Sequence, residues 1–170
     1  MLEAATLLIF PLCMSVAAIC DLLTMTIPNR ISLILLGAFI LLAPLLGLSF
    51  AEIGIHFGAA AIVFCCCFVF FALNVMGGGD AKLLTASALW FGLGPALLEF
   101  LIYVSLLGGV LTIVILMVRS KSSTIMAVGL PLPNSLLIAE KIPYGIAIAI
   151  GGFLVFPSSP LVMMVTSRIG

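Results

Sequence analysis

Long apolar stretches that are almost free of charge restrict the folds open to this chain. Hydrophobic residues make up 65% of its 170 residues and charged residues only 7%, whereas about a quarter of the residues in a soluble domain are charged. So few charges cannot cover a surface that faces water, and we therefore expect lipid to be the main solvent. The length predicts one domain over residues 1–170, and the formal net charge of zero gives no sign of a nucleic-acid partner.

Six of these stretches suit a bilayer crossing, which takes a helix of roughly 20 apolar residues. The predicted spans are Ala4–Cys20, Ile31–Leu48, Ile53–Met76, Leu83–Leu98, Phe100–Val118 and Ile142–Val165. Only Glu99 separates the fourth from the fifth, but one helix over both would be far longer than the membrane is thick. The segment Gly92–Pro95 is expected to turn the chain there, since proline breaks a helix and glycine permits a reversal. The sequence therefore predicts an all-α, polytopic membrane protein with six transmembrane helices.

The positive charges predict how these spans are oriented. If the spans alternate in direction, all Lys and Arg residues except Arg168 share one side of the membrane. They are Arg30, Lys82, Arg119, Lys121 and Lys141. Cytoplasmic loops carry such an excess of positive charge, so we place this side in the cytoplasm and both termini in the periplasm. Lys82 is interpreted as an anchor on the cytoplasmic side. The less apolar stretch 122–140 is interpreted as a cytoplasmic loop, with a re-entrant path as the alternative.

Two acids, Asp21 and Asp80, stand at the ends of predicted spans. Asp21 ends the first span and Asp80 follows the third. These spans run in the same direction, so both carboxylates reach the same, cytoplasmic, boundary. Ionisable residues at membrane depth are costly and indicate a functional site. Two carboxylates about 4 Å apart would repel by roughly 4 kcal/mol at an effective dielectric near 20, so the pair is expected to share one proton. A carboxylate beside a carboxylic acid can activate water and protonate a leaving amine, which is the chemistry of an aspartic peptidase.

Each aspartate also has a purely structural interpretation. Asp21 could be an interfacial residue or part of a helix-end turn that leads into Ile27–Arg30, and Asp80 could cap a helix that begins at Ala81. The three glycines Gly77–Gly79 favour the functional role of Asp80, because each disfavours a helix by about 1 kcal/mol relative to alanine. We therefore predict a sharp turn or the close approach of an extended substrate at this point.

Three motifs in this chain resemble those of the type IV prepilin peptidases, a family of intramembrane aspartic peptidases. They are Asp21 followed after five residues by Ile27-Pro28-Asn29, then Gly77-x-Gly79-Asp80, and finally Lys141-Ile142-Pro143-Tyr144-Gly145. The resemblance covers essentially the whole chain. It implies that Asp21 and Asp80 are the catalytic pair and that Gly77 and Gly79 shape the backbone beside Asp80. It further implies a structural or substrate-lining element made of Pro143, Tyr144 and Gly145.

The family resemblance also implies a substrate and a location. Such peptidases remove the short basic leader from prepilins and pseudopilins at the cytoplasmic face of the bacterial inner membrane. Long members carry an N-terminal region with paired C-x-x-C zinc motifs, and many also methylate the new N-terminus. Our chain has no C-x-x-C pair, so it resembles the short TadV/CpaA-type peptidases of tight-adherence (Flp) pilus systems. We expect no zinc or methylase region, no metal and no cofactor, and the sequence leaves methylation open.

Other functions fit parts of the sequence. A presenilin-like aspartic peptidase with other substrates would share the G-x-G-D motif. A proton- or ion-coupled transport subunit could use Asp21 and Asp80 as a relay, but transporters usually place such acids near the midplane and show internal repeats. A pilus scaffold without catalysis would leave the two acids unexplained. The only histidine, His56, lies near the outer end of the third span, so Ser–His or Cys–His catalysis beside the aspartates is not expected.

Overall fold

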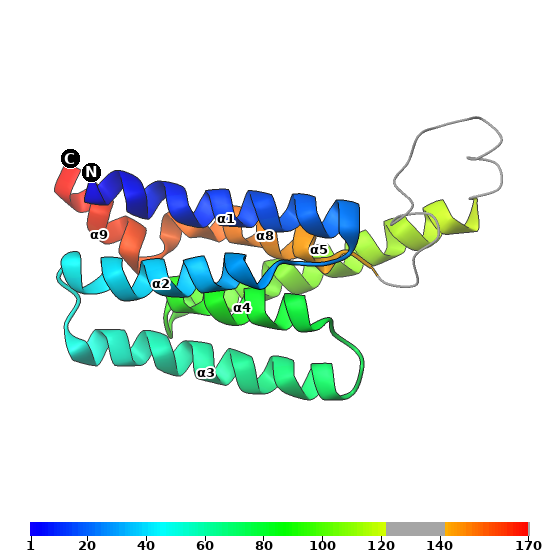
Figure 1. Cartoon of the computed structure of the whole chain (residues 1–170), viewed down its shortest axis with the longest axis horizontal. Helices are drawn as coiled ribbons and strands as arrows, with labels where there is room; N and C mark the ends of the chain where they lie inside the picture. The colour runs from blue at the N-terminus through cyan, green and yellow to red at the C-terminus, as the bar shows by residue number, and fades with distance from the viewer. Residues whose placement is uncertain (122–141, 170) are drawn as a thin grey trace.

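The computed structural model describes residues 1–121 and 142–169, and within these residues the chain contains helices and no strand (Figure 1). The predicted all-α class is therefore confirmed. The elements are α1 (Leu2–Thr24), α2 (Asn29–Leu45), α3 (Phe50–Ala72), α4 (Gly78–Phe91), α5 (Pro95–Ser120), α8 (Tyr144–Val155), the 3-10 helix η1 (Phe156–Ser158) and α9 (Pro160–Ile169). The predicted loop at 122–140 lies outside the described residues.

Three of the described helices, α1, α3 and α5, are long and apolar enough to cross a membrane. A fourth span results if α8, η1 and α9 are taken as one crossing bent by 43°. The helices α2 and α4 are shorter, at 17 and 14 residues. The described residues thus provide three to four candidate spans, and the count of six stays a prediction.

The last predicted span is interrupted, although the sequence predicts one continuous helix over Ile142–Val165. The helix α8 ends at Val155, and the chain passes through η1 before α9 begins at Pro160. Pro157 and Pro160 explain the interruption, because neither can donate an N–H to a preceding turn. Ser159 precedes α9, and its Oγ accepts the N–H of Val162 over 3.4 Å.

The predicted turn between the fourth and fifth helices is confirmed, but their predicted bounds are wrong. The helix α4 ends at Phe91 and α5 begins at Pro95, so Glu99 lies within α5 and not between the helices. Pro95 suits the first turn of a helix, where a missing N–H costs nothing. Gly92 adopts a left-handed φ of +63°, which glycine tolerates best.

We expect Gly92→Ala to lower the free energy of unfolding by about 1–3 kcal/mol or more. Alanine is strained at this φ, and its Cβ would lie 2.8 Å from Cε1 of the buried His56. Thermal unfolding of the detergent-solubilised protein measures the effect. The control is Gly94→Ala, where a Cβ meets nothing within 4 Å and the backbone is extended (φ −172°). Equal melting temperatures for the two variants would contradict this account of the turn.

The helices run side by side, with α8 packed against α1 and α5, and α4 packed against α2 and α3 (Figure 1). Aromatic side chains at the core join α1 to the end of α4 and to η1. Phe10 of α1 stacks on Phe156 at a centroid distance of 4.7 Å and meets the edge of Phe91 at 5.5 Å. Such pairs contribute about 0.5–1.5 kcal/mol each beyond area burial. They fix α1 and α4 relative to each other, and these two helices carry Asp21 and Asp80.

Candidate active site

Asp21 lies in the last turn of α1 and is only 5% exposed. Its Oδ2 atom accepts the main-chain N–H of Gly145, at the start of α8, over 2.6 Å. The helix α1 ends directly afterwards, because Met25 adopts a left-handed conformation (φ 54°, ψ 26°) and donates its N–H to the Asp21 carbonyl. A buried carboxylate needs such a donor, and the amino end of a helix adds a favourable dipole. The fold therefore holds the Asp21 carboxylate against the start of α8.

Asp80 is half-buried in the first turn of α4. The alternative that Asp80 caps a helix from Ala81 is wrong, because α4 begins at Gly78 and Gly77 is its N-cap. The Asp80 side chain folds back towards Gly77, where an added Cβ would lie 2.9 Å from Oδ2. The helix dipole favours a negative charge in this first turn. Both aspartates thus lie at the amino end of a helix, Asp21 at α8 and Asp80 at α4.

The sequence predicts a sharp turn at the three glycines before Asp80, but Gly78 and Gly79 belong to α4 and only Gly77 is extended. The structure gives a different reason for the small residues. A Cβ on Gly79 would lie 3.2 Å from the Cβ of Ile27, in the loop that follows α1. Gly79 therefore allows the segment after Asp21 to approach the segment that carries Asp80.

The two aspartates line one cavity of about 650 Å³. Its walls come from the ends of α1 and α3 with the loops that follow them, and from the starts of α4 and α8. Gly77, Gly79 and Tyr144, all predicted as site residues, line the cavity as well. Among its described lining residues, Asp21 and Asp80 are the only Asp, Glu, Lys, Arg or His side chains. The fold therefore brings together two carboxylates that are far apart in the sequence, in a space large enough for part of a peptide.

Asn29 also lines this cavity, although the sequence indicated it only as part of the Ile27-Pro28-Asn29 motif. Its Oδ1 accepts a hydrogen bond from Nζ of Lys82 over 2.9 Å. This contact links the start of α2 to the start of α4, two residues beyond Asp80. Lys82 therefore has a partner within the protein in addition to its predicted role as an anchor.

The Pro143-Tyr144-Gly145 element starts α8. Pro143 is the buried N-cap and Tyr144 the first helical residue, and Pro143 and Gly145 do not line the cavity. A Cβ on Gly145 would lie 2.8 Å from Oδ2 and 2.9 Å from Cβ of Asp21. Only glycine therefore lets the α8 backbone come close enough to donate to the carboxylate. The sequence marks this element through the family motif but does not reveal its contact with Asp21.

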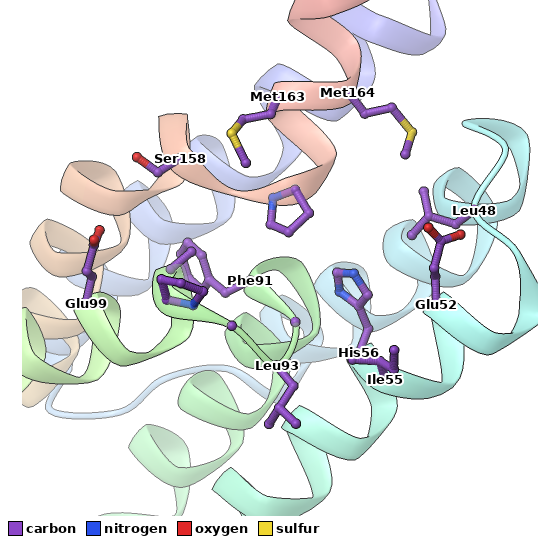
Figure 2. A pocket seen from close by; sticks show the side chains of 15 residues that line it. Leu48, Glu52, Ile55, His56, Phe91, Leu93, Glu99, Ser158, Met163 and Met164 are labelled. Atoms are coloured by element: carbon purple, nitrogen blue, oxygen red, sulfur yellow. The ribbon is translucent and has the colours of Figure 1, made fainter.

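His56 lies near the start of α3, at the end of the bundle opposite the aspartates, as the sequence predicts. It lines a second cavity of about 410 Å³ together with Glu52 and Glu99. Figure 2 shows Glu52 and His56 on neighbouring turns of one helix, with Met163 and Met164 across the cavity. The His56 Nδ1 atom is hydrogen-bonded to the Leu89 carbonyl. His56 therefore makes its contacts away from the cavity of the aspartates.

A sequence model of the type IV leader peptidase family matches residues 8–113, which is more than half of the chain. No curated protein and no solved structure matched the chain. The matched region includes Asp21, Gly77, Gly79 and Asp80, whereas the Pro143-Tyr144-Gly145 element lies beyond it. The match confirms the family predicted from the three motifs, and it implies a peptidase. With its long apolar helices, the chain is a membrane protein that belongs to the type IV leader peptidase family.

Proposed function

We propose that this protein is an aspartic endopeptidase that removes leader peptides from prepilins or pseudopilins, with Asp21 and Asp80 as its catalytic pair. The main support is that two carboxyl side chains from helices far apart in the sequence line one cavity, and that they are its only acidic or basic residues among the described lining residues. A structural role at one helix terminus or another does not explain why both carboxylates line the same cavity. Asp21 stands in the last turn of α1, where the helix dipole disfavours a negative charge, so its place in that helix costs stability.

The proposed reaction uses the two carboxyl groups as one unit that holds a single proton. The ionised carboxylate takes a proton from water, and the water oxygen attacks the carbonyl carbon of the scissile amide. The protonated carboxyl donates to the departing amine as the C–N bond breaks, and the pair then returns to its starting state. The N–H of Gly145 holds one oxygen of Asp21 throughout, so the carboxylate is oriented before the substrate arrives.

We further propose that the cavity opens at the cytoplasmic side of the bacterial inner membrane, with six spans and both termini in the periplasm. Arg30 and Lys82 stand at the starts of α2 and α4, at the same end as the aspartates. Glu52 and Glu99 line the cavity at the other end. This distribution follows the excess of positive charge in cytoplasmic loops. We propose a prepilin of the tight-adherence (Flp) type as the substrate, on the resemblance of the motifs to those of the TadV/CpaA-type peptidases.

The test of this function is leader removal from a co-expressed Flp-type prepilin, in a host that lacks its own prepilin peptidase. Mass spectrometry of the pilin N-terminus shows whether one defined bond is cut. We expect a single cut after the leader with the wild-type protein and none with the Asp21→Asn/Asp80→Asn double variant. Intact prepilin with the wild-type protein, for several prepilins, would contradict the proposed substrate. The presenilin-like peptidase and the transport subunit would then become the candidates.

We expect a metal chelator to leave the rate of leader removal unchanged. Within the described residues, no group of three or more His, Cys, Asp or Glu side chains is placed to hold a metal ion. The proposed chemistry also needs none, because the carboxyl pair activates the water itself. The rate is measured with purified protein in detergent before and after incubation with EDTA. A loss of activity that zinc restores would contradict the two-aspartate mechanism.

A further inference from the structure

Tyr144, the first residue of α8, is hydrogen-bonded to α5. The Thr112 Oγ1 atom lies 3.0 Å from the Tyr144 hydroxyl oxygen and donates to the Gly108 carbonyl over 2.7 Å. A threonine hydroxyl has one proton, and Thr112 uses it on Gly108. The Tyr144 hydroxyl therefore donates to Thr112, so Thr112 is the acceptor that holds the tip of the tyrosine.

Gly108 holds the ring of the same tyrosine by close packing. A Cβ at Gly108 would lie 2.7 Å from Cε1 and 3.1 Å from Cδ1 of Tyr144. The ring therefore lies directly against the α5 backbone, and a larger residue at this position would push it away. Gly109, the next residue along α5, is exposed, and a Cβ there meets nothing within 4 Å. The contact with the ring is thus specific to Gly108.

The position of Tyr144 matters because Gly145, its neighbour, donates to Asp21. The first residues of a helix have no intrahelical partner for their N–H groups, so the start of α8 depends on contacts with other elements. Asp21 accepts the N–H of Gly145, and α5 holds the Tyr144 side chain through Thr112. A shift of Tyr144 would therefore move the Gly145 N–H relative to the Asp21 carboxylate.

We propose that Thr112 and Gly108 are positioning residues for Asp21, acting through Tyr144 and the start of α8. This inference rests on the proposed catalytic role of Asp21. Neither Thr112 nor Gly108 lines the cavity of the aspartates, so neither touches the substrate there. Their loss changes the geometry of the reacting groups more than the affinity for the prepilin, and it lowers kcat more than it raises KM.

The first comparison uses adjacent glycines. Gly108→Ala lowers kcat for leader removal, whereas Gly109→Ala leaves it at the wild-type value. Both substitutions add the same methyl group to α5, so any general effect on the helix is shared. Melting temperatures in detergent and the amount of each variant in the membrane are measured alongside. Equal kcat values for the two variants overturn the role of Gly108.

The second comparison uses the hydrogen bond. Thr112→Val and Tyr144→Phe each lower kcat by about three- to tenfold, as expected for the loss of one hydrogen bond. The double variant is no slower than either single one, because both changes remove the same contact. Thr112→Ser keeps the acceptor and most of the rate. The control is Thr85→Val on α4, because Thr85 makes the same bond to the carbonyl four residues earlier.

The outcomes separate this inference from the proposed function. If Asp21→Asn abolishes cleavage but Thr112→Val cuts at the wild-type rate, the positioning role is wrong and the peptidase stands. If Tyr144→Phe is slow and Thr112→Val is not, the tyrosine hydroxyl acts elsewhere and Thr112 has no part. If the kcat losses of Thr112→Val and Tyr144→Phe multiply in the double variant, the two side chains do not act through one shared contact and the inference is wrong. If Asp21→Asn itself cuts normally, the proposed function fails first.

Discussion

Asp21→Asn and Asp80→Asn each abolish leader removal, with a loss of at least about 10²–10⁴-fold, the usual contribution of a catalytic acid or base. An amide neither takes the proton from water nor donates one to the leaving amine. The substitution nearly preserves shape, and the remaining side-chain oxygen at position 21 can still accept the N–H of Gly145. The folded protein should therefore survive while the reaction stops. Cleavage is followed by the mobility shift of a co-expressed Flp-type prepilin.

Two controls make this result specific to the cavity of the aspartates. Glu99→Gln makes the same change at the other end of the bundle, and we expect wild-type cleavage. The double aspartate variant should be no worse than either single one, since residues that act as one unit are not additive. Each variant must be present in the membrane at wild-type levels. If either single variant cuts at near the normal rate, the catalytic pair is wrong and that acid has a structural role.

Gly145→Ala is expected to lower kcat by about 10²-fold, as a displacement of about 1 Å in a catalytic group can do. The added Cβ would lie within 3 Å of two atoms of Asp21. Either the carboxylate or the start of α8 must move, and the N–H contact of 2.6 Å is then lost. Steady-state kinetics with a solubilised prepilin separate kcat from KM.

The matched control for Gly145→Ala is Gly37→Ala in α2, where a Cβ meets nothing within 4 Å. Alanine favours a helix over glycine by about 1 kcal/mol, so this variant should be as active as wild type and at least as stable. A melting temperature for Gly145→Ala near that of wild type would show that the loss lies in the site and not in folding. Wild-type kcat for Gly145→Ala would mean that the contact between α8 and Asp21 has no part in the reaction.

The features that depend on charge and on helix direction could be predicted from the sequence. The placement of Asp21 and Asp80 at the same end of the bundle follows because two parallel spans end at one boundary, and the structure has both residues lining one cavity. The turn at Gly92–Pro95 follows from proline and glycine chemistry, and it is present. Both predictions need only the position of a residue along a helix and not the neighbours of that helix.

The features that depend on which helices are neighbours could not be predicted. The contact between Asp21 and Gly145 joins residues 124 positions apart, and the contact between Thr112 and Tyr144 links α5 to α8. Helices that are apolar on all sides give little sequence indication of which face packs inward, because an apolar side chain such as leucine is equally suited to contact lipid or another helix. The start of α4 at Gly78 is not predictable from the sequence for a related reason. Intrinsic propensity disfavours glycine in a helix, but Gly78 packs closely against Phe71 and Gly79 against Ile27, where small residues fit best.

The donor to Asp21 is a main-chain N–H, and this changes what natural selection can act on at position 145. Every amino acid except proline would supply the same donor, so the chemistry of the contact survives almost any substitution. The space allows only glycine. Selection at this position therefore operates on size alone, and a compensating change would have to come from a residue that moves α8 outward, not from one that replaces the hydrogen bond.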